Sequence, residues 1–257
     1  MPILAIDTST MVSSVAVGDK KKLAAELTVQ TRLTHSETLM PHIQQVMEMA
    51  GIRREELDAV AVNIGPGSFT GLRIGLGAAK AMAYALDIPL IGVPAMVVLA
   101  WQTQAPGIRL VPLIDAQKGN VYTASYIWEP AAENGQTTLK LTCQEAINVK
   151  ALQEVLDQLA ADGGLAMVSG DMAAKKAAML AEQGRLPENI ILAEAQAIMP
   201  RAACVAIAAA HRLEAGDYEM SAVMDMEPIY IRRSEAEELW EKRQAKLAAE
   251  AGEQAEP

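Results

Sequence analysis

Short apolar runs alternate along the chain with longer stretches in which apolar residues recur at helical spacing. Over the first hundred residues this pattern predicts strands at 3–7, 13–18 and 23–30, a helix at 34–50, a strand at 57–64, a helix at 72–86, a strand at 89–93 and a helix at 95–102. The helix at 34–50 starts with a possible capping box, Thr34 to Glu37, although Pro41 falls early in its pattern. The predicted order is βββαβαβα.

The second half repeats that order. We expect strands at 109–116, 121–128 and 138–143 with a polar loop at 129–137, a helix at 150–162, a strand at 165–169, a helix at 173–183, a strand at 189–193 and a helix at 201–214. Two such copies predict an α/β tandem ribonuclease-H-like fold, the architecture of the actin, hexokinase and Hsp70 superfamily. The expected domains are 1–104 and 105–232, with the option that the last helix packs back on the first domain.

The segment 233–257 is a charged tail rich in Ala, Glu, Lys and Arg. The pair Glu238 and Lys242, four residues apart, would support an exposed helix. Trp240 is the exception in this polar stretch, and it either pins the tail to the body or marks a contact site.

The composition restricts the function. Because the formal net charge is −10 and the pI about 4.9, the chain repels a polyanion, and autonomous tight binding of RNA or DNA is not expected. No apolar run approaches the roughly 18 residues of a membrane span, and no signal peptide is evident, so we expect a cytoplasmic protein. The two cysteines, Cys143 and Cys204, are interpreted as buried free thiols.

The first candidate site follows the opening strand, at Asp7, Thr8, Ser9 and Thr10. An acidic residue with hydroxyls in a tight turn between strands is where the actin-like superfamily holds nucleotide phosphates. The alternative is a hairpin in which Asp7 and Ser9 satisfy backbone groups.

The second candidate is the glycine-rich loop and helix from 65 to 79. The loop sequence Gly-Pro-Gly-Ser-Phe-Thr-Gly is neither a Walker loop nor a dinucleotide fingerprint, although its backbone could cradle a phosphate. Gly67, Gly71, Gly75 and Ala79 recur every four residues, and Gly77 adds another. Each interior glycine costs a helix roughly 1 kcal/mol relative to Ala, so these residues indicate a close neighbour. That neighbour is either the protein's own sheet or another subunit.

Two residue types nearby leave alternatives open. Phe69, the only Phe in the chain, is either a buried plug or an interface anchor. His35 and His42 are seven residues apart, no Cys or carboxylate completes a metal site with them, and a polar role beside the helix cap is favoured for His35.

Four segments together resemble the TsaB (YeaZ) family: Ile-Asp-Thr-Ser-Thr at 6–10, His-Ser-Glu-Thr-Leu-Met-Pro at 35–41, Gly-Pro-Gly-Ser-Phe-Thr-Gly-Leu-Arg-Ile-Gly at 65–75 and Pro-Ile-Tyr-Ile-Arg at 228–232. The resemblance runs from residue 1 to about 232. It implies a non-catalytic scaffold that binds and activates TsaD, the transferase that makes threonylcarbamoyladenosine at position 37 of ANN-decoding tRNAs, together with the ATPase TsaE.

The resemblance also implies the working surface. Family members pair with TsaD through helices of the first domain, and with themselves through a similar surface, while tRNA is met only through the complex. The residues assigned to that surface are His35, Glu37, Leu39, Met40, Phe69, Gly71, Leu72, Gly75 and Ala79. No cofactor is expected to be firmly bound, and ATP or ADP is placed at the interface of the complex.

The residues themselves favour a non-catalytic role. TsaD-like proteins carry a His-x-x-x-His metal pair after the strand that follows the glycine helix, whereas residues 92–99 here contain no His. Relatives have Ala-Arg-Arg/Lys-x-Glu-Val-Tyr where residues 116–122 read Ala-Gln-Lys-Gly-Asn-Val-Tyr. The rival hypotheses are a stand-alone actin-like ATPase or small-molecule kinase, which would turn over ATP alone, and a metalloprotease, which would need metal ligands.

Overall fold

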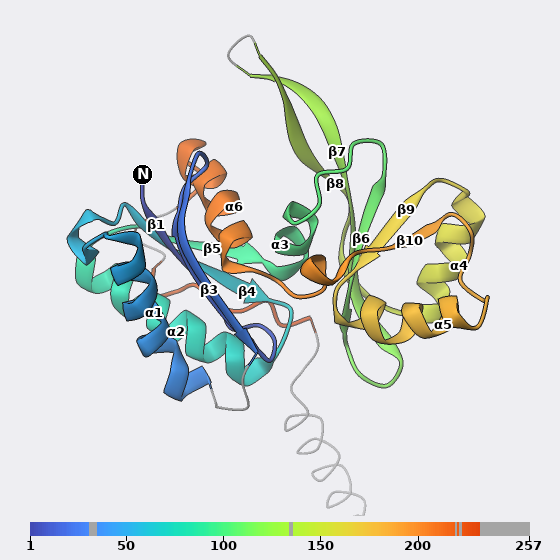
Figure 1. The fold of residues 1–257 in the computed structure, drawn as a ribbon, viewed down its shortest axis with the longest axis horizontal. Helices are drawn as coiled ribbons and strands as arrows, with labels where there is room; N and C mark the ends of the chain where they lie inside the picture. Colours follow the sequence, from blue (N-terminus) through green and yellow to red (C-terminus); the bar gives the residue numbers. More distant parts are fainter. Residues whose placement is uncertain (31–34, 134–135, 219, 221–222, 232–257) are drawn as a thin grey trace, which may run out of the picture.

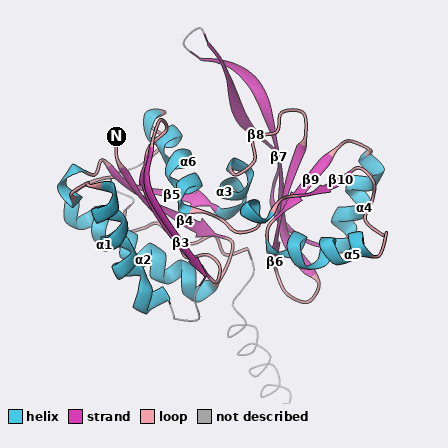
Figure 2. Cartoon of the chain, in the orientation of Figure 1, coloured by secondary structure: helices cyan, strands magenta, loops and turns pink. Residues whose placement is uncertain are grey.

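The computed structural model describes residues 1–30, 35–133, 136–218, 220 and 223–231. Within them the chain forms two five-stranded sheets, each flanked by helices, with one helix lying between the sheets (Figure 1). The strands and helices follow the order βββαβαβα twice, which confirms the predicted tandem fold (Figure 2).

The first sheet has the order β3-β2-β1-β4-β5. Its strands are β1 (Ile3–Asp7), β2 (Val12–Gly18), β3 (Leu23–Gln30), β4 (Ala59–Gly65) and β5 (Leu90–Pro94). β1 pairs antiparallel with β2 and parallel with β4, with Ile6 opposite Val62. The C-terminal ends of β1 and β4 therefore lie side by side, where open α/β sheets place their sites.

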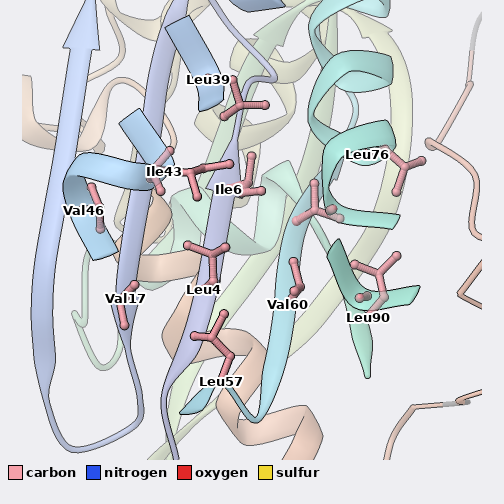
Figure 3. Packing of buried hydrophobic residues seen from close by; sticks show 14 of the residues in the cluster. Leu4, Ile6, Val17, Leu39, Ile43, Val46, Leu57, Val60, Leu76 and Leu90 are labelled. Atoms are coloured by element: carbon pink, nitrogen blue, oxygen red, sulfur yellow. The ribbon is translucent and has the colours of Figure 1, made fainter. Parts of the chain in front are cut away.

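Both faces of this sheet are covered, which explains why β1 and β2 are buried at every position. Leu4 and Ile6 point to the face covered by α1 (His35–Ala50) and α2 (Phe69–Leu86), where they meet residues such as Leu39 and Leu76 (Figure 3). Ile3 and Ala5 point to the opposite face, covered by α3 (Ala95–Trp101) and α6 (Ala202–Glu214). The last helix of the second half thus packs on the sheet of the first.

The second sheet has the order β10-β9-β6-β7-β8. Its strands are β6 (Arg109–Asp115), β7 (Asn120–Glu133), β8 (Gln136–Ala151), β9 (Ala166–Ser169) and β10 (Ile190–Leu192). This half also contains α4 (Leu152–Asp162), the π-helical turn η2 (Ala173–Ala177) and α5 (Ala178–Glu182). α4 and η2 pack on one face of the sheet. Two short 3-10 turns, η1 (Arg54–Glu56) and η3 (Ala195–Ala197), lie in the connections between other elements. α3 packs on the other face, where Trp101 meets Trp128 edge to face at 4.8 Å between ring centroids.

The predicted loop at 129–137 is wrong. β7 and β8 stay paired past it, from Glu129 opposite Lys140 to Glu133 opposite Gln136, and form an arm that projects beyond the sheet (Figure 1). Most of the described side chains of this arm are exposed, so its sequence has no alternating apolar face and resembles that of a loop. The predicted cap at Thr34 and the tail at 233–257 lie outside the described residues. The helix α1 runs continuously through Pro41.

Candidate functional site

The predicted turn after β1 contains a closed network of buried hydrogen bonds. The Asp7 carboxylate accepts bonds from the amide N–H of Ser9 at 3.0 Å, from the Ser9 hydroxyl at 2.7 Å and from the Asn63 amide nitrogen at 2.6 Å. The Asn63 side chain comes from the adjacent end of β4, and its oxygen accepts the amide N–H of Gly65 at 2.8 Å. The network therefore joins the turn after β1 to the start of the glycine loop.

Burial has a clear electrostatic consequence for Asp7. Loss of water raises the pKa of this carboxyl above its ordinary value, and the hydrogen bonds from Asn63 and Ser9 offset only part of that effect. The group is consequently easier to protonate in the folded chain than in water.

The glycine loop packs directly on the same turn. The amide N–H of Ser68 donates to the carbonyl oxygen of Ser9 at 2.7 Å, and the Thr8 hydroxyl donates to the carbonyl oxygen of Gly71 at 2.7 Å. A β-carbon on Gly67 would overlap the backbone of Ser9, and one on Gly71 the backbone of Thr8. The glycines are needed because the chain's own turn approaches the backbone of α2.

This placement corrects the interpretation of the small-residue spacing. A β-carbon on Gly75 would overlap the Thr8 hydroxyl, so the close neighbour of Gly71 and Gly75 is this chain and not another subunit. The other members of the assigned surface that are buried are Leu39, Leu72 and Ala79. Five of the nine assigned residues thus belong to the interior, because the period of four follows the inner face of α2 rather than its outer face.

The assigned nucleotide residues also have internal roles. Asp7, Thr8 and Ser9 are each 1% exposed, and the hydroxyl of the half-buried Thr10 accepts the amide N–H of Val12 at 3.1 Å. Of the two alternatives for this turn, the geometry favours the hairpin whose side chains satisfy its own polar groups. These residues alone do not offer a free phosphate cradle.

The surface of this region is the outer side of α1 and α2. On α1 it presents Glu37 and Met40, and on α2 Phe69, Arg73, Gly77, Ala81, Tyr84 and Ala85, all of them exposed. We call these eight residues the α1/α2 face. Gly77, Ala81 and Ala85 recur every four residues on the exposed side of α2, as Gly71, Gly75 and Ala79 do on its buried side. A β-carbon on Gly77 would meet open space. The extra glycine at 77 was the signal in the sequence that could have located this outer stripe.

Phe69 is the aromatic centre of one end of this face. It is 38% exposed, so it is not a buried plug, and its ring lies 5.3 Å from the ring of Tyr230. The guanidinium of Arg73 lies over the Phe69 ring at 3.9 Å, and its Nε donates to the Tyr230 hydroxyl at 3.0 Å. Sequence reasoning did not assign Arg73 and Tyr230 to the surface, although both stand in the family motifs.

Tyr230 belongs to a strap, residues 223–231, that runs back from the second half to α2. Val223 is buried in the core beneath α1 and α2, Lys80 of α2 donates to the carbonyl of Met224 at 2.7 Å, and the Ile229 amide donates to the carbonyl of Ile64 at 2.8 Å. The strap therefore follows α2 from Lys80 towards its first turn.

The histidines hold α1 against the turn. Nε2 of His35 donates to the carbonyl oxygen of Thr10 at 2.7 Å, and Nδ1 of His42 lies 3.0 Å from the Ser13 hydroxyl. Burial lowers the pKa of His42, and the nearby His35 lowers it further. Over the part of the chain that the structure describes, no group of three or more His, Cys, Asp or Glu side chains is arranged to hold a metal ion.

The remaining features lie away from this region. Cys143 is exposed and Cys204 only half-buried, so the prediction of two buried thiols is wrong for Cys143, which lies on the edge strand β8. The turn after β6 holds Gln117 and Lys118 at positive φ, with the Asp115 carboxylate accepting the Gln117 amide N–H at 2.7 Å. None of the helices in the described segments combines the length and the apolar character that a bilayer crossing requires.

Comparison with known proteins supports the motif assignment. Residues 29–240 match the family model described as TsaD, tRNA N6-adenosine threonylcarbamoyltransferase. The protein "tRNA threonylcarbamoyladenosine biosynthesis protein TsaB" of Escherichia coli K12 is 36% identical over 129 residues, which is 49% of this chain and 55% of the relative. Its namesake in Bacillus subtilis 168 is 35% identical over 126 residues, with the same two shares. The chain thus spans about half the length of the curated relatives it matches.

Solved structures agree on the fold. A Pseudomonas aeruginosa protein described as similar to peptidase YEAZ superposes with a TM-score of 0.70 at 24% identity, covering 90% of this chain and 99% of that one. YeaZ from the same organism gives a TM-score of 0.63 at 23% identity, with 89% and 99% covered. The chain belongs to the family described as TsaD, tRNA N6-adenosine threonylcarbamoyltransferase, and its curated sequence relatives place it with the TsaB (YeaZ) proteins.

Proposed function

We propose that the chain is a non-catalytic subunit of the machinery that makes threonylcarbamoyladenosine in tRNA. It docks through the α1/α2 face onto the transferase TsaD and activates it, with TsaE as the ATPase and tRNA bound only by the assembled complex. A second copy of the chain competes for the same face.

The packing of the glycine loop on the turn after β1 carries this proposal. In a catalyst of the actin-like superfamily this turn must receive phosphates through its free backbone N–H groups. Here the Ser9 amide N–H is used by Asp7, and Ser68 and Gly71 lie directly against Ser9 and Thr8. A turn closed by its own chain supports a scaffold better than an ATPase.

The exposed side chains of the α1/α2 face support the docking role. Tyr84 is 73% exposed, Met40 54% and Phe69 38%, and the middle of α2 carries only small exposed residues, Gly77, Ala81 and Ala85. Aromatic anchors beside a flat strip of small residues suit the close approach of helices from another subunit. The acidic net charge of the chain supports a division of labour in which a partner provides the surface for tRNA.

The proposal assigns no nucleotide to this chain alone. Asp7, Thr8 and Ser9 have their side-chain oxygens engaged inside the fold, and these residues do not fit the role of a phosphate site. ATP or ADP is placed at the interface of the complex, where TsaD contributes the other side.

A matched pair of substitutions tests the docking role. Ala81→Arg adds bulk and charge in the middle of the α1/α2 face, whereas Ala161→Arg makes the same change on the exposed side of α4 in the second half. Gel filtration with TsaD should show co-elution for the wild type and Ala161→Arg and lose it for Ala81→Arg. Co-elution of Ala81→Arg with unchanged affinity would reject this face.

The division of labour has its own measurement. The purified chain should produce no modified tRNA and no steady ATP turnover, and TsaD with TsaE should gain activity when the chain is added. Product formed without TsaD, or ATP turnover by the isolated chain, would instead support the stand-alone enzyme.

A further inference from the structure

A small cavity lies between α4 and the second sheet, in the half of the chain that the proposed function does not use. It is formed where β6, β7 and β8 pass beneath α4, and it contains about 280 Å³ of empty space, counting the part that opens to solvent. Its apolar wall includes Val111, Val155 and Leu159, all of them core residues of this half. Pockets for cofactor-sized ligands usually have about 300–1,000 Å³, so this cavity suits a molecule of only a few non-hydrogen atoms.

The buried side of the cavity carries two hydroxyl groups from β7. Thr123 is 3% exposed and Ser125 6%, and both line the cavity. The Oγ atom of Ser125 is buried and has no hydrogen-bond partner among the described residues. Buried hydroxyls in folded proteins are almost always hydrogen-bonded, because an unpaired one has lost its water without compensation. Ser125 therefore favours a polar ligand at this position.

Irregular strand pairing explains why no protein group satisfies Ser125. Thr123 lies opposite Asn148 and Ser125 opposite Glu145, so the register between β7 and β8 shifts at this point. Such a bulge interrupts the ladder and changes the direction of nearby side chains. Ser125 consequently faces Glu145 across the two strands without a hydrogen bond between them.

The rim of the cavity carries two cations. Nζ of Lys150 donates to Glu145 at 2.7 Å and to Gln158 of α4 at 3.0 Å, which uses two of the three N–H groups of an ammonium. NH1 of Arg109 donates to Asp162 at the end of α4 at 2.5 Å, and a guanidinium has five N–H groups in all. Both cations thus hold α4 against the sheet and keep donors for a further acceptor.

The one carboxylate on the rim is already engaged. Oε1 of Glu145 accepts from Lys150 and from the Asn148 amide nitrogen, each at 2.7 Å. The hydrogen bond from Lys150, together with that from Asn148 and the nearby charge of Arg109, holds the pKa of Glu145 below its ordinary value. Glu145 is therefore ionised at neutral pH and serves mainly to position Lys150.

This lining selects the chemical class of the ligand. A cation would be repelled by Lys150 and Arg109, and an apolar molecule would leave the Ser125 hydroxyl unpaired. An anion with two charges would lie against ionised Glu145. A carboxylate carries one charge and two acceptor oxygens, and hydrogen bonds between charged groups are the stronger ones. A short hydrocarbon chain attached to it would contact Val155.

We propose that the cavity between α4 and the second sheet binds a short-chain monocarboxylate through the Ser125 hydroxyl and the Lys150 ammonium, with Arg109 at its opening. The bound ligand joins β7 and β8 to α4 and stabilises the second half of the chain. No residue of the α1/α2 face takes part, so this site can hold or fail separately from the proposed function.

Saturation-transfer NMR with acetate tests the site in the full-length chain. The methyl signal of acetate should show saturable binding to the wild type. Ser125→Ala and Lys150→Met should each raise the dissociation constant about tenfold or more, as for the loss of a hydrogen bond to a charged group. Ser125→Ala removes a hydroxyl that has no protein partner, so the fold should be unaffected, and circular dichroism checks this. Lys140→Met, on the exposed arm of the same strand, is the matched control and should bind acetate like the wild type.

Competition separates a carboxylate site from general attraction of anions. Propionate should displace acetate, whereas chloride at equal ionic strength should not. Equal displacement by chloride would overturn the assignment of a carboxylate. Absence of saturable acetate binding, or the same dissociation constant in the wild type, Ser125→Ala and Lys150→Met, would mean that the cavity holds water only and would overturn the site itself.

Discussion

The hydroxyl of Thr8 donates a hydrogen bond to the carbonyl oxygen of Gly71 at 2.7 Å, so the turn after β1 is attached to the first turn of α2. The backbone of Thr8 in return occupies the space that a side chain at position 71 would need. This single contact decides how the glycine motif should be understood. The motif holds the turn after β1 against α2 within this chain, and the exposed surface of α2 lies on the other side of the helix.

The contact between the turn after β1 and α2 predicts that substitutions at two glycines of α2 have opposite effects on stability. Gly71→Ala places a β-carbon against the Thr8 carbonyl, and we expect the free energy of unfolding to fall by about 2 kcal/mol. Gly77→Ala meets open space in a helix interior and should raise it by about 1 kcal/mol. Urea unfolding of the three proteins checks both signs. Equal effects from the two substitutions would contradict the packing.

The same geometry changes the choice of docking variants. If the close neighbour of Gly71 and Gly75 were another subunit, Gly75→Leu or Gly71→Leu would remove partner binding and leave the fold intact. Since a β-carbon at Gly75 already overlaps the Thr8 hydroxyl, such a variant would test folding and not docking. Ala81→Arg is the informative replacement because it changes only the exposed side of α2.

Asp7 predicts a specific dependence of stability on pH. Its pKa is raised in the folded state, so the folded chain binds this proton more tightly than the unfolded chain. Ionisation of Asp7 then lowers stability as the pH rises from about 4, the ordinary range for Asp, through the raised value. Asp7→Asn lacks this titration and keeps the others.

The difference between the two proteins isolates the effect. The free energy of unfolding of the wild type relative to Asp7→Asn should decrease as the pH is raised through this window and level off above it. Urea titrations from pH 4 to 8 provide the measurement. A difference that increases with pH would mean that the hydrogen bonds from Asn63 and Ser9 outweigh burial.

Much of the fold was predictable because its strands and helices carry periodic apolar patterns. The buried runs of β1 and β4 and the helical spacing in α1 gave the order of elements correctly. The β7–β8 arm was missed because most of its described side chains are exposed, so its residues carry no apolar alternation. Pattern reasoning detects a strand only where one of its faces is buried.

Four of the residues that the sequence assigned to a partner surface lie on the inner side of α2 instead: Gly71, Leu72, Gly75 and Ala79. A period of four small residues indicates a close approach, and it does not say which neighbour approaches. Gly71 and Gly75 face the turn at Thr8, and Gly77 faces solvent, yet all three have the same signature in the sequence. The contact of Tyr230 with Phe69 was equally hidden, because the two residues are far apart in the chain.

The two thiols should differ strongly in reactivity. Cys143 is exposed on β8, whereas burial, with a smaller contribution from Glu26, raises the pKa of Cys204 to about 12. At pH 8 only about one part in ten thousand of such a thiol is thiolate, the reactive form. Iodoacetamide should therefore modify one cysteine rapidly in the native chain, and Cys143→Ser should abolish that fast phase. A fast phase that persists in Cys143→Ser would place Cys204 in solvent.

The contact between Arg73 and Tyr230 should hold the strap on α2, and a double-mutant cycle can measure it. Arg73→Met removes the guanidinium that contacts the ring and the hydroxyl of Tyr230, and Tyr230→Ala removes that ring. Both groups are exposed, so we expect a coupling of about 0.5–1 kcal/mol in the free energy of unfolding. Arg73→Met with Tyr218→Ala is the control cycle and should show no coupling. If the Arg73 and Tyr230 substitutions are additive, the strap is held by its other contacts, those of Val223, Met224 and Ile229, and Arg73 does not fix Tyr230 at the α1/α2 face.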